Sequence, residues 1–233
     1  LGVRRQLSSG IPALDALTGG GIDEGTSTLI SGPPGTGKSS LCSQYVHAAT
    51  QRGEKAAMFL FEEAEGNLLI RSEGLGIDLQ SAIDKGLLTI QQIDPAELSP
   101  GEFMHAVVNA QRAGARIIVI DSLTGDLQAM PDERFLATHL HELLTYLGQH
   151  GVATIIVGGH PSRGSPGTGS VDASYVADSI VMLRYFEARG KVHQAISVFK
   201  KRVGPHERAI RLYERKGFVR EGTTSRESRI GGT

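Results

Sequence analysis

"GPPGTGKS", Gly32 to Ser39, is the stretch that decides the fold of this chain. It satisfies the pattern G-x-x-x-x-G-K-[ST] at every fixed position, and it lies between a predicted strand, 28–30, and a predicted helix, 38–51. The glycines let backbone N–H groups curl around phosphate oxygens, and the amino end of the helix adds partial positive charge. A chance glycine turn is the alternative. Because motif and context agree, the stretch predicts a phosphate-binding loop.

The residues of this loop divide the work of holding a nucleoside triphosphate. Lys38 is predicted to reach the β- and γ-phosphates, and the Ser39 hydroxyl is predicted to ligate Mg²⁺. The predicted nucleotide-binding set is Gly32, Pro33, Pro34, Gly35, Thr36, Gly37, Lys38, Ser39 and Ser40. The expected cofactors are therefore ATP and Mg²⁺.

A second motif, "RIIVIDS", supplies an acidic partner for the metal. Asp121 ends a fully apolar strand, 117–120, where a Walker B aspartate would hold Mg²⁺ through water. A helix N-cap aspartate is the alternative interpretation. The presence of the phosphate-binding loop in the same chain favours the metal.

Two adjacent carboxylates end another apolar run, in "KAAMFLFEEAEG" at 55–66. Like charges repel and each carboxylate prefers water, so the packing of a buried strand does not explain why Glu62 and Glu63 stand at its tip. If the sheet is parallel, they lie at the same edge as the loop and face the γ-phosphate. A carboxylate there can deprotonate an attacking water or hydroxyl. Spacing alone does not tell which of the two is this base; we favour Glu62, and a solvated loop acid remains the alternative for one of the pair.

Strands and helices alternate along most of the chain. Strands are predicted at 28–30, 56–61, 87–91, 117–120 and 152–159, and helices at 38–51, 67–77, 100–112 and 132–151. Later runs, at 179–186, 194–199 and 209–213, indicate an antiparallel extension. The predicted fold class is α/β, with a mostly parallel central sheet flanked by helices and a C-terminal antiparallel β extension. We expect one domain over 1–221 and a disordered tail over 222–233.

The bulk composition limits the classes of partner. The net charge is −1 over 233 residues, so a polyanion would need a local basic patch. One cysteine, Cys42, excludes an internal disulfide and suits a reducing compartment, so a cytoplasmic location is expected. No apolar run approaches the length of a membrane span. The chain begins at Leu1 rather than Met, and we expect a fragment of a longer protein or a single-domain protein.

These motifs together resemble the RecA-like ATPases, and specifically the KaiC family. The resemblance extends from "SSGIPALDALTGGG" to "HERAIRLY" and rests on the "FEE" pair, on "VIDSLT" and on "VADSIVMLRYFEARGKVHQAISVFKKRVGPHE". It implies that the first glutamate is the base. It also implies a ring, commonly a hexamer, with ATP between subunits. "DPAELSPGEF" is similar to the second domain of bacterial KaiC-like proteins.

The resemblance assigns roles to a basic segment that would otherwise be interpreted as a solvated turn. In "FKKRVGPHE" the family's Lys-x-Arg pattern falls on Lys200 and Arg202, which would reach the ATP of the neighbouring subunit, and His206 holds the family's histidine position. Ser174 matches the serine of the family's phosphorylated Ser-Thr pair. Tyr175 stands at the threonine position, which puts a two-site phosphorylation cycle in doubt.

Three functions follow for comparison. The first is a ring-forming, Mg-dependent ATPase with serine/threonine autokinase activity and unidentified protein partners. The second is a DNA-binding recombinase of the same fold, but the candidate loop "SRGSPGTGS" holds one arginine, Arg163, so DNA is not expected as the main ligand. The third is a scaffold that nucleotide merely holds together. An intact glutamate pair, Lys38 and Asp121 argue against it.

Overall fold

The computed structural model describes residues 5–122, 133–158, 177–188, 190–201, 210–214 and 217–219. The predicted domain end at 221 and the predicted tail, 222–233, lie outside these ranges. Within them, no helix is both long enough and apolar enough to cross a bilayer.

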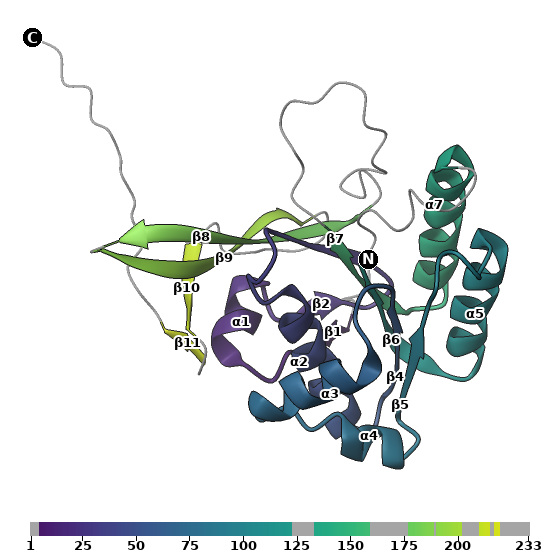
Figure 1. The fold of residues 1–233 in the computed structure, drawn as a ribbon, viewed down its shortest axis with the longest axis horizontal. Coiled ribbons are helices and arrows are strands. Elements are labelled where there is room, and N and C mark those ends of the chain that lie inside the picture. The colour runs from purple at the N-terminus through teal and green to yellow at the C-terminus, as the bar shows by residue number, and fades with distance from the viewer. Residues whose placement is uncertain are drawn as a thin grey trace, which may run out of the picture.

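A single large sheet forms the centre of the described structure (Figure 1). Its strands are β3 Ser27–Ser31, β4 Lys55–Leu60, β5 Leu88–Gln92, β6 Ala115–Asp121, β7 Ala153–Gly158, β8 Ser179–Ala188, β9 Lys191–Lys201, β10 Ile210–Glu214 and β11 Gly217–Val219. Among the described residues they lie in the order β11-β10-β9-β8-β3-β7-β6-β4-β5.

The sheet has a parallel part and an antiparallel part, as predicted. Neighbouring strands from β8 through β3, β7, β6 and β4 to β5 pair in parallel. β9, β10 and β11 continue the sheet in antiparallel fashion. One detail differs from the prediction: β8 was expected in the extension, but it pairs in parallel with β3 and antiparallel with β9. The extension therefore begins at β9.

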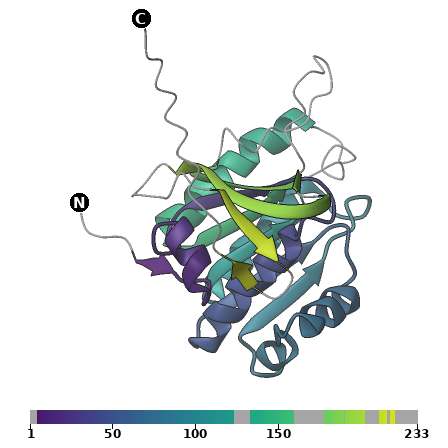
Figure 2. The same ribbon diagram turned by 90° about the vertical axis from the view of Figure 1, so that its left-hand side faces the viewer.

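Helices cover both faces of the parallel part (Figures 1 and 2). They are α1 Pro12–Leu17, α2 Lys38–Gln51, α3 Glu65–Gly74, α4 Gln80–Asp84, α5 Pro100–Arg112 and α7 Glu133–Gln149. The first four pack into one apolar cluster, and α5 and α7 pack into the other. Alternate residues of β4 enter opposite clusters, since Met58 belongs to the first and Phe59 to the second. This alternation makes the strand apolar throughout.

Two helices lie where the sequence predicted them, and their details follow from the sequence. Ser99 caps α5 in a capping box, with its side chain accepting from the Glu102 amide at 3.3 Å. α7 buries a stripe of leucines at Leu140, Leu143, Leu144 and Leu147.

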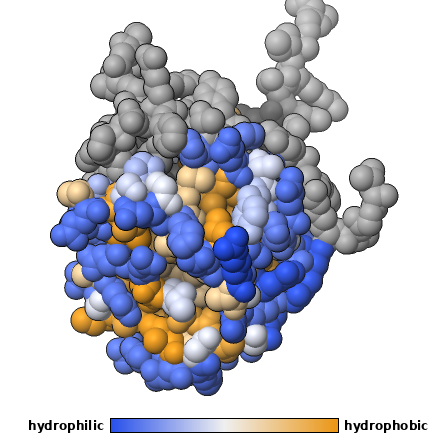
Figure 3. All heavy atoms as spheres, turned by 90° about the vertical axis from the view of Figure 1, so that its right-hand side faces the viewer, coloured by the Kyte–Doolittle hydropathy of each residue, from blue (hydrophilic) through white to orange (hydrophobic). Residues whose placement is uncertain are grey.

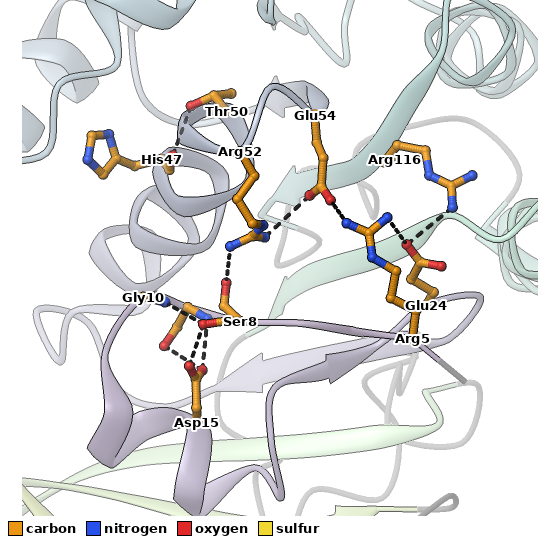
Figure 4. A network of polar contacts seen from close by, with 11 residues as sticks. Arg5, Ser8, Gly10, Asp15, Glu24, His47, Thr50, Arg52, Glu54 and Arg116 are labelled. Atoms are coloured by element: carbon orange, nitrogen blue, oxygen red, sulfur yellow. Dashed lines mark hydrogen bonds and ion pairs between the residues drawn. The ribbon is translucent and has the colours of Figure 1, made fainter. Parts of the chain in front are cut away.

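The N-terminal segment forms a small sheet of β1 Gln6–Leu7 and β2 Ile22–Asp23. A network of charges joins this segment to the main sheet (Figure 4). Glu54 pairs with Arg5 and lies 3.3 Å from Arg52, and Glu24 lies 3.1 Å from Arg116. Glu24 and Glu54 thus connect segments that are distant in sequence.

We expect Glu54→Ala to lower the free energy of unfolding by about 1 kcal/mol, because Glu54 forms ion pairs with two arginines and is more shielded from water than a typical surface acid. Its side chain is only 10% exposed. Urea denaturation measures the change, with exposed Glu97→Ala as the control. Equal stability of the two variants would show that the network does not stabilise the fold.

Candidate functional site

The predicted site segments meet at the carboxyl edge of the parallel strands. Leu60 of β4 pairs with Asp121 of β6, and the Phe61 amide donates to the Asp121 carbonyl at 2.8 Å. Ser31, at the end of β3, pairs with Gly158 of β7 at the same edge. The glutamate pair follows Phe61 directly. The prediction that these strand ends share one edge is therefore confirmed.

The geometry of the loop explains its glycines. Gly35 and Gly37 have φ values of 77° and 93°, in the left-handed region that side chains disfavour. Gly32 lies against β8, where a Cβ would come 2.4 Å from the Leu183 carbonyl oxygen. The loop can pass this close to β8 only with glycine at that position.

The β8–β9 hairpin also contacts the loop through two polar side chains. The Tyr185 hydroxyl lies 3.4 Å from the Pro34 carbonyl oxygen, and the Gln194 amide lies 3.3 Å from that of Gly35. Tyr185 and Gln194 pair across the two strands. Sequence reasoning missed both residues, because only the pairing of β8 with β3 brings the hairpin to the loop.

Lys38 lies over the loop at the start of α2. Its ammonium donates to the Gly32 carbonyl at 2.9 Å and to the Pro33 carbonyl at 3.0 Å. Burial lowers the pKa of Lys38, while the nearby charges of Asp121 and Glu62 oppose that shift. The Lys38 ammonium therefore lies near Asp121 and Glu62, two of the three predicted acids.

Two further loop residues have distinct settings. Thr36 is fully buried, and its hydroxyl donates to the Pro33 carbonyl at 2.7 Å. Ser40 lies half-buried in the first turn of α2. Thr36 thus closes the loop on itself, and Ser40 extends the predicted nucleotide-binding residues into the first turn of the helix.

Asp121 offers a buried oxygen suited to a cation. Its Oδ2 atom is buried and, among the described residues, has no hydrogen-bond partner. The Ser39 side chain lies close enough to this carboxylate to lower its pKa. Burial raises the pKa of Asp121, Glu63 and Glu62 raise it further, and Ser39 and Arg71 oppose the rise. An unpartnered carboxylate oxygen beside a hydroxyl is a hard oxygen donor set that fits Mg²⁺.

The two glutamates have different surroundings. Glu62 is exposed and accepts a hydrogen bond from the Ser122 hydroxyl at 3.0 Å. Glu63 is half-buried and forms an ion pair with Arg71 of α3. Sequence reasoning missed Ser122 and Arg71. The sequence did hold a signal that Arg71 faces the protein interior: it follows the apolar Leu68 by three residues and therefore lies on the same side of the helix.

Several predicted residues cannot be placed. Arg202, His206 and Ser174 lie outside the described residues, and so does the side chain of Lys200, although its backbone is in β9. The residue between the predicted pair, Lys201, is described. Its ammonium lies 3.3 Å from Asp23 and donates to the Thr18 carbonyl at 2.5 Å.

A groove of about 570 Å³ lies away from the loop, along α5, β4 and β5. Apolar residues such as Met58 and Ile90 line it together with His105 and Asn109. Figure 3 shows the face of the molecule on this side, where apolar residues are exposed among hydrophilic ones. The groove shares no residue with the phosphate-binding loop.

A glycine-rich loop that opens a helix, with a lysine and a buried aspartate at the edge of a parallel sheet, defines a P-loop nucleotide-binding protein. A family model described as "ATPase: KaiC" matches residues 7–216. The chain therefore belongs to the KaiC family, a family of nucleotide-binding ATPases with a RecA-like fold.

Individual relatives support this assignment. The circadian clock oscillator protein KaiC of Thermostichus vulcanus is 28% identical over 236 residues, which cover 98% of this chain and 45% of that protein. The proteins of the same name from Prochlorococcus marinus (strain MIT 9313) and Parasynechococcus marenigrum (strain WH8102) are each 30% identical over 89% of this chain and over 42% and 41% of their own length. The chain thus spans less than half of these relatives.

Proposed function

We propose that this chain binds ATP with Mg²⁺ and hydrolyses it, with Glu62 as the general base. The observation that carries the proposal is the asymmetry of the glutamate pair. Glu62 is exposed at the edge that also holds Lys38 and Asp121, whereas Glu63 is engaged by Arg71. A base must be free to approach the attacking oxygen, so Glu62 fits this role better.

The chain's own residues then have defined tasks. Loop amides and Lys38 bind the phosphates, and Ser39 and Asp121 would hold Mg²⁺. When bound, Mg²⁺ offsets the negative charge of the phosphate oxygens. Glu62 takes a proton from water as the water oxygen bonds to the γ-phosphorus. The bond from that phosphorus to the β,γ-bridging oxygen breaks, and the products are ADP and inorganic phosphate.

The proposal includes a ring in which each nucleotide lies between two subunits. By resemblance to the family, Lys200 and Arg202 would stabilise transition-state charge on the neighbour's ATP, and His206 would contact the same nucleotide. A homo-oligomer, commonly a hexamer in the family, is therefore expected. Sizing with and without ATP tests whether a ring forms.

An autokinase reaction is a further part of the proposal, carried by the resemblance at Ser174. The serine oxygen would take the place of water, giving phosphoserine and ADP, with Glu62 as base. Mass spectrometry after incubation with ATP tests this reaction. A phosphate that persists in Ser174→Ala would exclude this serine as the acceptor.

The hydrolysis itself is tested by phosphate release from ATP, with Mg²⁺ and with Mg²⁺ chelated. We expect turnover that requires Mg²⁺. Binding of ATP without any Mg²⁺-dependent release of phosphate would favour the scaffold instead.

We expect Asp121→Asn to abolish turnover and yet to raise the free energy of unfolding at pH 7 by about 1 kcal/mol, because it removes a buried charge whose Oδ2 atom has no hydrogen-bond partner among the described residues. The raised pKa means that the folded state resists ionisation, so the charged carboxylate lowers stability above that pKa. The gain should shrink as the pH falls through the pKa of Asp121. Urea denaturation at neutral and acid pH measures it. A loss of stability at pH 7 would contradict this account of the buried charge.

A further inference from the structure

α3 holds Arg71 beside the glutamate pair. The helix is fixed on α2, because Leu68 is fully buried and the buried Ser72 hydroxyl lies 3.3 Å from that of Ser43. Arg71 lies between these two anchors. Its position is therefore set by the packing of α3, and its guanidinium reaches Glu63 from there.

The guanidinium of Arg71 is only partly satisfied. The side chain is 36% exposed, and Nη1 pairs with Glu63. Nε and Nη2, however, are buried and have no hydrogen-bond partner within the described ranges. Buried donors without partners lower stability. The need for folding stability alone therefore does not explain an arginine at this position.

The charge balance of the edge gives a reason. Glu62, Glu63 and Asp121 are three carboxylates at one edge of the sheet; among the described residues, Lys38 lies near Glu62 and Asp121, and Arg71 forms an ion pair with Glu63. Without Arg71, Glu63 would lose this ion pair. An uncompensated Glu63 would then repel Glu62 and compete with it for the lysine.

We propose that Arg71 is a positioning residue that holds Glu63 in an ion pair on α3 and thereby leaves Glu62 as the single carboxylate that takes the proton. This inference rests on the proposed hydrolysis. It predicts that Arg71 acts through Glu63 and makes no direct contribution at the phosphate. Neutralising Glu63 should then make Arg71 dispensable.

A double-mutant cycle tests this coupling directly. Arg71→Ala is expected to lower kcat for ATP hydrolysis about tenfold, with KM within about twofold of wild type, because the loss is in chemistry and not in binding. The double variant Arg71→Ala/Glu63→Gln is expected to turn over ATP within about threefold of Glu63→Gln alone, since coupled residues are not additive. Arg71→Lys keeps the charge and should recover part of kcat.

Two outcomes would overturn the inference. One is a double variant slowed by the product of the two single effects, which would mean that Arg71 acts independently of Glu63. The other is wild-type kcat in Arg71→Ala. If thermal melting shows that Arg71→Ala does not fold, the same cycle is run with Arg71→Met, which keeps the apolar stem. Failure of the proposed function is distinguishable, since the wild type would then release no phosphate or Glu62→Gln would remain fully active.

Discussion

Glu62→Gln is expected to lower kcat for ATP hydrolysis by about 10³-fold, the typical contribution of a general base. The amide keeps the size of the side chain and can still accept from the Ser122 hydroxyl, which lies 3.0 Å away in the native protein. It cannot accept the proton of the attacking water. ATP affinity should persist, because the loop and Lys38 are unchanged. Phosphate release and equilibrium binding of ATP measure the two effects separately.

The matched control is Glu73→Gln, an exposed glutamate near the carboxyl end of the same helix as Arg71. It should turn over ATP as the wild type does. Unchanged turnover in Glu62→Gln would refute the assignment of the base. A large loss of ATP affinity in that variant would show instead that Glu62 belongs to the binding site.

Lys201→Met is expected to lower the free energy of unfolding by about 3–5 kcal/mol, because it leaves a buried charge without its partner. The side chains of Lys201 and Asp23 are only 4% and 6% exposed, with 3.3 Å between the ammonium and the carboxylate. The Thr18 carbonyl would lose its donor as well. Chemical denaturation measures the loss.

Two further variants make this prediction specific. Lys191→Met changes an exposed lysine at the start of the same strand and should leave stability nearly unchanged. The double variant Lys201→Met/Asp23→Asn removes both charges and should be more stable than Lys201→Met alone. If Lys201→Met and Lys191→Met are equally stable, the ion pair does not hold β9 to the N-terminal segment.

The sequence predicted the parallel sheet well because its strands are apolar on both faces. The predicted strands at 28–30, 56–61 and 117–120 correspond to β3, β4 and β6, and the helix 38–51 is α2. Short elements were missed, among them β1 and β2, because two-residue strands carry no periodic signal. The partners of β8 were also missed, since pairing between distant strands is not encoded in either strand alone.

The residues of the candidate site could be predicted from the sequence, but the contacts between their side chains could not. Motif spacing placed the loop, Asp121 and the glutamate pair at one edge. The difference between Glu62 and Glu63 depends on Arg71, whose direction is set by the packing of α3 on α2. The burial of Lys201 likewise depends on Asp23, far away in the sequence, so a run of basic residues could not show which lysine is structural.

A mixing experiment tests the central claim, that one nucleotide is served by segments of two adjoining subunits. Glu62→Gln retains the basic segment, and Arg202→Ala retains the glutamate, and each variant alone should be nearly inactive. When equal amounts of the two variants are refolded together or exchanged into mixed rings, we predict about a quarter of wild-type phosphate release, because about a quarter of the interfaces then combine an intact Glu62 with an intact Arg202. A mixture no more active than its components would contradict the shared site.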